Sequence, residues 1–486
     1  MTIRISGMAS GMDIDKIVTD LMRAEKLPAQ KLYQKKQSLI WSRDEYRNVN
    51  KTLSQLMNSA DKLRFSTNFS KLSASSSNES VVSATVQSGA KAASYSVQVN
   101  KLATSATLIG DELPVGTKFD ETILANGTIT ISNGTTDKDI QLGSKTIKSV
   151  LNEINNSGLG VRASYDTKNN RITLVSETMG EKSEIELTGD TAALGFASGV
   201  VNKGNNAEVL VNGQSISISN NNLELDGVSL SLKGISSSPV VVNVSKDISA
   251  VKNTIMDFVN LYNDTIDKLR SKTSETLFRD YKPLTDEEKS GMTEKQIELW
   301  ESKAKSGLLR NDSIIEETIY SLRNALAQGL ESTGSFKSLS DIGIDFKSFL
   351  DGGVTELGKL KIDESKLEQA IIDHPEEIVN LFTQVPTADK SNPKERFAQT
   401  GFADRIYQTL QTQSSKISKK IGNGTNSEAV DNSYYGNLLK DLNSKILSMD
   451  DRLERIETRY YKQFTAMEKA IQQLNSQGSW LSQQLG

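Results

Sequence analysis

Cysteine is absent from this chain of 486 residues, and histidine occurs once, at His374. The first absence excludes disulfides, thiolate catalysis and cysteine zinc sites. The second leaves one candidate base for nucleophilic catalysis and no histidine pair for a metal. Proline is also scarce, with 7 residues, and glycine numbers 32. This scarcity favours long secondary-structure elements over linker-rich disorder.

An excess of one charge is also missing. The 57 Lys and Arg residues almost balance the 61 Asp and Glu residues, for a net charge of -4. Such a balance does not suit a nucleic-acid footprint. No run approaches the ~20 apolar residues of a membrane span, and Met1 to Gly11 lack the basic and apolar regions of a secretory signal peptide. We expect that the protein binds no nucleic acid, does not insert into a membrane and has no cleaved leader. These features alone predict a cytoplasmic protein.

Both ends of the chain carry apolar residues at helical spacing, over residues 13 to about 64 and 438 to 484. Asp13 suits a helix N-cap, and Pro28 should end or kink the first helix near Leu27. After it, apolar residues follow a heptad seam, which favours a coiled coil over a helix packed on a globular core. The seam consists of Leu32, Leu39, Tyr46, Val49, Leu53, Leu56, Ala60 and Leu63.

The last helix has the strongest periodicity, stepping by three and four from Leu439 to Tyr460, with a stutter before Phe464. Its apolar surface continues toward the terminus, where little of the chain remains to cover it, so it favours contact with another subunit. Pro28 and Gly478 are candidate hinges. The candidate interface and chaperone-binding residues are Ile14, Ile17, Leu21, Met22, Tyr460, Phe464, Met467, Ile471, Leu474, Trp480, Leu481 and Leu485.

Between the ends, the pattern changes to short alternating strands separated by polar turns. Asn126-Gly127, Asn133-Gly134 and Asn212-Gly213 suit tight hairpins, and residues 145–156 suit one helix. Helical spacing returns after Asp247, with a polar excursion over 271–305 and a predicted capping box at Ser313-Ile-Ile-Glu316.

The predicted class is α+β, with antiparallel helical legs formed by the two ends and two inserted β-rich head domains. The expected parts are a terminal coiled-coil leg that is flexible until assembly, a helical bundle, an inner β-rich domain and an outer inserted one. The leg spans 1–42 with 455–486, and the bundle spans 43–72 with 246–454. The inner β-rich domain spans 73–108 with 205–245, and the outer one spans 109–204.

The residues offer no active site. His374 lies between two predicted helices and suits a solvated cap. Glu184 with Glu186, and Asp450 with Asp451, are carboxylate pairs on polar faces. Paired acids can hydrolyse glycosides, yet solvated surface charge explains these pairs better. We expect a protein that is not an enzyme and has no cofactor.

Several motifs together resemble the bacterial flagellar filament-cap family (FliD). The chain opens with Gly7-Met-Ala-Ser-Gly-Met-Asp-Ile-Asp-Lys16 and Leu21-Met-Arg-Ala-Glu25, and it closes with Arg459-Tyr-Tyr-Lys-Gln-Phe-Thr-Ala-Met-Glu468 and Trp480-Leu-Ser-Gln-Gln-Leu485. Internal matches include Tyr95-Ser-Val-Gln-Val-Asn-Lys-Leu-Ala103, Val211-Asn-Gly213, Phe258-Val-Asn-Leu-Tyr-Asn263 and Leu339-Ser-Asp-Ile-Gly-Ile344. The resemblance covers nearly the whole chain in order, and the segments 109–205 and 271–305 do not contribute to it.

The resemblance implies an extracellular cap at the filament tip that helps exported flagellin to fold and insert and prevents its loss. It also implies a homo-oligomeric ring, with five subunits expected and six as the alternative. Export would follow the flagellar type III channel without a cleaved signal, which reverses the cytoplasmic expectation. The implied partners are flagellin, the hook–filament junction proteins and a cytoplasmic export chaperone that binds the last helix.

Two other functions remain open at this point. The β-rich head domains could make the protein an adhesin for host mucin or glycans, a role that could coexist with capping. A carbohydrate-active enzyme built on the β region is the third hypothesis, and it has the least support from the residues.

Overall fold

A computed structural model describes residues 11–121, 124–332, 334–423 and 430–485. The chain divides into two compact units, one built from the chain up to Phe69 and from Ile248 onward, the other from Ser70–Asp247. Long terminal helices pack together in the first unit, and antiparallel β-sheets form the second. The α+β prediction is therefore confirmed. Within the described ranges, no helix has the length and apolar character needed to cross a membrane.

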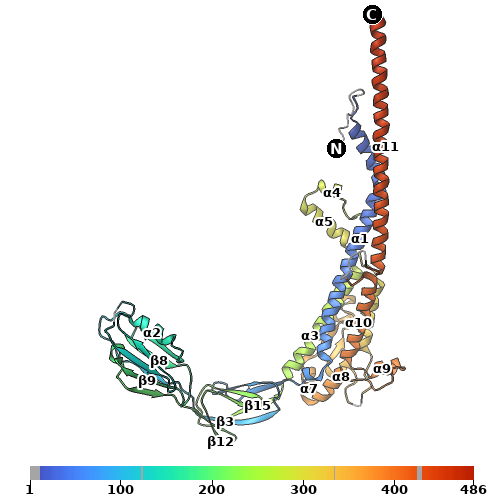
Figure 1. Ribbon diagram of the computed structural model, residues 1–486. Helices are drawn as coiled ribbons and strands as arrows, with labels where there is room; N and C mark the ends of the chain where they lie inside the picture. The colour runs from blue at the N-terminus through green and yellow to red at the C-terminus, as the bar shows by residue number, and fades with distance from the viewer. Residues whose placement is uncertain (1–10, 122–123, 333, 424–429, 486) are drawn as a thin grey trace. The chain divides into compact units, whose positions relative to one another are not determined.

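The first unit is helical. Its longest members are α1 (Ile14–Leu63) and α11 (Tyr434–Leu485), which lie side by side (Figure 1). The other helices are α3 (Ile248–Ser274), α4 (Asp286–Ser290), α5 (Glu294–Lys305), α6 (Ser313–Ala327), α7 (Glu364–Asp373), α8 (Pro375–Thr383), α9 (Pro393–Gln399) and α10 (Phe402–Ile421). A small antiparallel hairpin of β16 (Ile344–Phe346) and β17 (Leu360–Ile362) completes this unit.

Helix α1 begins where expected, since Asp13 Oδ1 accepts a hydrogen bond from the Lys16 backbone N–H at 3.0 Å. Pro28 was predicted to end or kink this helix near Leu27. The helix does not end there, because α1 continues through Pro28 to Leu63, and the kink remains a prediction. A proline inside a helix costs about 3 kcal/mol. Pro28 itself is exposed, while Met22 and Ala29 on either side of it are buried against α11. This packing offsets the lost backbone hydrogen bond.

The second half of α1 forms part of a globular core instead of a two-stranded coiled coil. Its buried residues from Tyr46 to Leu63 belong to one apolar cluster with side chains of α3, α6, α7, α8 and α10. The seam residues from Tyr46 onward are thus buried as expected, but several helices cover them. Leu32 and Leu39 are only half-buried. The coiled-coil interpretation was wrong for this stretch.

A buried polar network joins α1, α6 and α10. The Tyr46 hydroxyl donates to Asp312 Oδ2, and Lys420 Nζ donates to both groups. Burial and the Asp312 carboxylate raise the pKa of Tyr46. Asp312 also caps α6, accepting from the N–H groups of Ile314 and Ile315 at 3.1 and 3.2 Å. The predicted capping box starting at Ser313 was wrong by one residue, because the longer carboxylate side chain takes the N-cap position.

Arg405 fixes the start of α10 against the ends of α6 and α9. Its guanidinium is buried and donates to the carbonyls of Gln328, Gly329 and Ala398. Burial lowers the pKa of Arg405 to about 10. Gly401 precedes this helix and lies against the backbone of α8, so that a Cβ there would stand 2.4 Å from the Phe382 carbonyl oxygen.

The second unit contains two layered β arrangements with separate cores. One sheet has the strand order β1-β15-β3-β11-β12 and faces a sheet ordered β13-β14-β2 across a shared apolar core. The other core lies among sheets ordered β10-β9-β5-β6 and β4-β8-β7, together with α2 (Ile147–Asn155). The strand pairs among the described residues of this unit are all antiparallel.

The strands of this unit follow the alternation of the sequence, with apolar residues turned inward at every second position. Their bounds are β1 (Leu72–Ser76), β2 (Val82–Val86), β3 (Ala93–Lys101), β4 (Thr107–Ile109), β5 (Thr128–Ser132), β6 (Asp137–Gln141), β7 (Val161–Asp166), β8 (Arg171–Ser176), β9 (Glu184–Gly189), β10 (Val200–Lys203), β11 (Ala207–Val211), β12 (Gln214–Ile218), β13 (Asn222–Leu225), β14 (Val228–Leu232) and β15 (Val240–Lys246).

Only one of the three Asn-Gly pairs forms a two-residue hairpin turn. Asn212 and Gly213 connect β11 to β12, with φ of 49° and 83°. Asn133-Gly134 lies in a longer connection between β5 and β6. Asn126-Gly127 precedes β5 and joins no paired strands, so that prediction was wrong. A second tight turn, at Asp226-Gly227 between β13 and β14, has φ of 46° and 80° and was missed.

The chain passes between the two β cores at one place. Ala103 belongs to the first core and Ala106 to the second, and the return strand pairs Thr104 with Asn205. The finer division into leg, bundle, inner and outer domains remains a prediction.

Replacement of Gly401 by Ala should destabilise the helical unit by about 1–3 kcal/mol, because the new methyl group meets backbone atoms that cannot move aside. Urea unfolding followed by circular dichroism at helical wavelengths would measure the change. Gly291→Ala is the matched control, since the nearest atom to a Cβ there lies 3.9 Å away. Equal unfolding midpoints for the two variants would contradict this account of the α10 start.

Candidate interface along the terminal helices

Helices α1 and α11 form an antiparallel pair. The Tyr33 hydroxyl donates to Asp450 Oδ2 at 2.7 Å, and the Tyr460 hydroxyl donates to Glu25 Oε1 at 3.2 Å. Residue numbers rise along one helix as they fall along the other, which fixes the direction. Figure 1 shows α1 in blue beside α11 in red. Both tyrosines link the two helices through their hydroxyls, and the Tyr460 ring also packs against apolar residues of the pair.

An apolar seam runs along the same helix pair, partly between these polar contacts and partly beyond the Glu25–Tyr460 contact. Its buried members are Ile14, Val18, Met22 and Ala29 of α1 with Leu453 and Ile456 of α11, and Met449, Tyr460, Tyr461 and Phe464 pack half-buried against them. Complete burial of an aliphatic side chain contributes about 1.5–3 kcal/mol. The first four turns of α1 therefore depend on α11 for their place.

The predicted interface residues fall into two groups. Ile14 and Met22 are covered within the chain, and Tyr460 and Phe464 partly so. Ile17 is half-buried, whereas Leu21 is 39 % exposed. The structure brings Ile14, Met22, Tyr460 and Phe464 together, but it does so inside one subunit.

Beyond Phe464, α11 continues as a helix with an uncovered apolar side. Met467 and Ile471 are half-buried, and Leu474, Trp480 and Leu481 are 65 %, 57 % and 52 % exposed. The side chain of Leu485 lies outside the described part of the structure. At about 1.5 Å per residue, this end of α11 extends about 30 Å beyond the seam with α1. Figure 1 shows α11 continuing past the start of α1.

Gly478 does not interrupt this helix, because α11 is continuous from Tyr434 to Leu485. The apolar spacing of three and four places Gly478 at a position of the stripe between Leu474 and Leu481. A Cβ there would have no heavy atom within 4 Å. Gly478 thus leaves a gap in the stripe where other positions carry a side chain. Its role as a hinge, like that of Pro28, remains a prediction.

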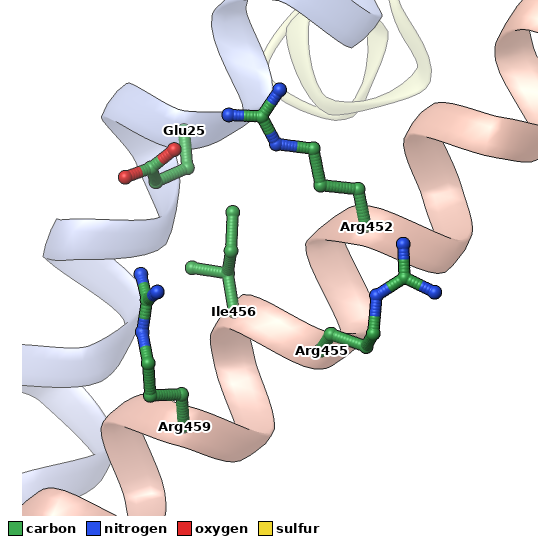
Figure 2. A pocket seen from close by; sticks show the side chains of 5 residues that line it. All are labelled: Glu25, Arg452, Arg455, Ile456 and Arg459. Carbon is green, nitrogen blue, oxygen red and sulfur yellow. The ribbon is translucent and has the colours of Figure 1, made fainter.

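Charged residues on α11 were missed as candidates. Arg452, Arg455 and Arg459 line a shallow cavity of about 430 Å³ together with Ile456 of α11 and Glu25 of α1. Figure 2 shows Arg452 and Arg459 extending toward α1 on either side of Ile456, and Arg455 pointing away from α1. Their spacing of three and four in the sequence could have revealed them.

The residues considered for catalysis make contacts that stabilise the fold. His374 joins α7 to α8, is half exposed and has Nδ1 3.5 Å from Glu377. Glu184 pairs with Lys203 at 2.9 Å, and Asp450 accepts from Tyr33. Among the described residues, no group of three potential metal ligands occurs.

These features define a class of protein. Two long helices are joined along part of their length, the longer one carries an uncovered apolar end, and the intervening sequence supplies β-sheets. This is the organisation of a structural protein.

Comparison with known proteins identifies the family. The family described as "Flagellar hook-associated protein 2 C-terminus" matches residues 204–476, and the family of the corresponding N-terminus matches residues 10–106. The flagellin hook IN motif matches residues 128–178. The chain is 31 % identical to flagellar hook-associated protein 2 of Halalkalibacterium halodurans, covering 99 % of both chains. It is 25 % identical to the protein of that name from Escherichia coli K12, covering 98 % of this chain and 97 % of the other.

Among solved structures, the flagellar cap protein FliD D1-D2-D3 domains from Escherichia coli match with a TM-score of 0.47 and 22 % identity. That match covers 76 % of this chain and 95 % of the other. The chain belongs to the flagellar hook-associated protein 2 family, the cap proteins of the filament tip, and it is a structural protein and not an enzyme.

Replacement of Leu453 by Ala should loosen the start of α1, because it leaves a cavity opposite the buried side chains of its first turns. We expect a local loss of about 2–4 kcal/mol. Amide hydrogen exchange should accelerate over residues 14–29 and stay unchanged over 46–63. Leu447→Ala, at an exposed position of the same helix, is the control. Unchanged protection of 14–29 in the Leu453 variant would refute the proposed dependence of α1 on α11.

The Tyr33–Asp450 hydrogen bond should make the helix pair sensitive to alkaline pH. The hydrogen bond, with burial and the nearby carboxylate, raises the pKa of Tyr33 from 10.0 to about 12. A raised pKa stabilises the folded state fully below pH 10, and this contribution disappears as the pH rises from 10 to about 12.

The tyrosinate absorbance of wild type minus that of Tyr33→Phe would give the titration of this one residue. Asp450→Asn should move its midpoint back toward 10. A wild-type midpoint already near 10 would rule out the hydrogen bond in solution.

Proposed function

We propose that this cap protein acts as a homo-oligomeric ring in which neighbouring subunits and filament flagellin cover the free end of α11. The exposed apolar stripe of α11 carries the proposal. Leu474, Trp480 and Leu481 are each more than half exposed on the last turns of α11, beyond the apolar cluster that it shares with α1. Apolar surface of this kind at a free end is typical of an interaction site.

A ring also explains the gap at Gly478. In helix–helix packing, a large side chain of one helix inserts between residues of the other. The open position at Gly478, with the apolar side chains of Leu474 and Leu481 on either side, offers such a space. A partner helix from a neighbouring subunit would fill it.

The ring would hold newly exported flagellin at the tip, help it to fold and insert, and prevent its loss. Equivalent contacts between successive subunits close a ring only at a fixed rotation. Five subunits are the expectation, and six the alternative. The cap would meet flagellin and, at the start of filament growth, the hook–filament junction proteins.

Before assembly, the same stripe would be covered by an export chaperone in the cytoplasm. An isolated helix is marginally stable in water, so the end of α11 can unfold for passage through the type III channel and order again on assembly. The support for this route is the resemblance of the terminal motifs and the uncovered stripe.

Glycan binding by the β unit has less support. Its four aromatic residues are Tyr95, Phe119, Tyr165 and Phe196. Tyr95 and Phe196 are buried, and Phe119 stacks on Tyr165 at 4.8 Å, so that none is an exposed platform for a sugar ring. We therefore favour capping without a glycan site.

Replacement of both Trp480 and Leu481 by Ala should weaken self-association and filament attachment by about tenfold or more, because it removes large apolar side chains from the uncovered end. Sedimentation analysis and a filament pull-down would measure the loss, and deletion of residues 478–486 should have the same effect.

The matched control replaces the exposed Gln483 and Gln484 by Ala in the same turns of α11. Circular dichroism should show the β unit intact in every variant. Tight rings and normal filaments from the Trp480 and Leu481 variant would contradict the proposal.

A further inference from the structure

A stripe of positive charge runs along α11 beside its apolar seam. Arg452, Arg455, Arg459 and Lys462 recur at intervals of three, four and three residues, which places them on one side of the helix. All four side chains are exposed. None of them forms an ion pair or hydrogen bond with another residue in the described part of the chain. We call these four residues the basic stripe.

The basic stripe borders two shallow cavities. Three arginines and Ile456 of α11 line the first together with Glu25 of α1, but only Arg452 and Arg459 extend toward α1. Glu25 already accepts a hydrogen bond from the Tyr460 hydroxyl. The second cavity, of about 410 Å³, lies between Arg455, Arg459 and Lys462 and also includes Glu454. Positive charge exceeds negative charge in both. Figure 2 shows that the guanidinium groups of Arg452 and Arg455 are well separated, so the stripe presents an extended surface and not a single point.

An acidic counterpart occurs in the arm formed by α4 and α5, which projects beside α1 (Figure 1). The arm is a built structure. Trp300 Nε1 donates to the Lys282 carbonyl at 2.8 Å, and the Trp300 ring lies 4.6 Å from that of Tyr281. Lys289 of α4 pairs with Glu301 of α5 at 2.8 Å. These contacts hold α4 firmly against α5.

The first turn of α4 carries free negative charge at its surface. Asp286, Glu287 and Glu288 are consecutive and exposed. Glu288 is used by the capping box with Thr285. Asp286 and Glu287 pair with no cation among the described residues. We call Asp286 and Glu287 the acidic turn.

We propose that the acidic turn of one subunit docks on the basic stripe of a second copy of this chain. Among the described residues of one chain this contact is absent, and the base of the arm lies on α1, where Lys305 Nζ stands 4.8 Å from the centre of the Trp41 ring. Each subunit therefore offers one acidic surface and one basic surface. Such a head-to-tail pair of different surfaces repeats around a ring. The inference thus rests on the proposed ring and names one of its contacts.

Charge complementarity of this type chiefly sets the partner, the register and the rate of association. The apolar end of α11 would supply most of the affinity, and the arm would select the neighbouring subunit and its height along α11. The contact should weaken at high salt, because exposed charges are screened.

Charge reversal tests the proposal. Arg455→Glu with Arg459→Glu, and separately Asp286→Lys with Glu287→Lys, should each weaken self-association by about tenfold. A mixture of the two reversed chains should restore association at the junctions where reversed surfaces meet, and the quadruple variant should restore complete rings. Reversal of two exposed lysines of the β unit, Lys138→Glu with Lys168→Glu, is the control and should have no effect.

A disulfide experiment places the contact. The natural chain has no cysteine, so Glu287→Cys in one chain and Arg455→Cys in another should yield a mixed disulfide on oxidation, and its yield should fall at high salt. Ser237→Cys, an exposed position of the β unit, paired with Arg455→Cys is the control.

Three results would overturn the inference. If rings form and neither reversal changes them, the ring stands and this contact is wrong. If reversal of the basic stripe leaves rings intact but abolishes attachment to flagellin filaments, the occupant of the stripe is flagellin. If the wild-type chain does not self-associate, both the ring and this contact fail.

Discussion

The packing of α1 against α11 is the interaction on which the helical unit depends. The buried seam around Met22 and Ile456, together with the Tyr33 and Tyr460 hydrogen bonds, brings together segments more than four hundred residues apart in the chain. The cost of closing so long a loop rises only slowly with its length, so a β unit can be inserted between the two helices without losing the pair. The two helices are of nearly equal length but offset along their axes, so the same seam leaves the last turns of α11 uncovered, and the proposed assembly follows from that offset.

Much of the architecture could be predicted because it depends on periodicity. Alternation identified the strands around Val97, Val209 and Leu230, and helical spacing identified α1 and α11. Predictions based on single prolines and on Asn-Gly pairs were less reliable. Pro28 lies inside a helix because packing on both sides of it outweighs one lost hydrogen bond, and Asn126-Gly127 makes no hairpin because no strand precedes it to pair with β5. Tertiary contacts decided both, and a single sequence does not display them.

The interface residues were partly predictable for the same reason. Spacing identifies which residues share a side of α11, but it does not show where α1 begins to cover that side. Ile14 and Leu474 look alike in the sequence, yet one is buried in the chain and the other exposed. The basic stripe followed the same spacing as the apolar seam and was overlooked because charged residues on a helix are usually solvated. The structure was needed to show that the basic stripe lacks ionic partners, because the sequence does not give the positions of neighbouring side chains.

The uncovered end of α11 has a thermodynamic consequence for the flagellum. A lone helix of this length gains little stability from its own hydrogen bonds. Its folding free energy therefore comes largely from whatever binds it, and the fraction of ordered helix ends depends on the concentration of the binding partner. In the proposed ring, the order of this segment would depend on several molecules together, and a subunit detached from its neighbours would lose the structure that lets it bind elsewhere.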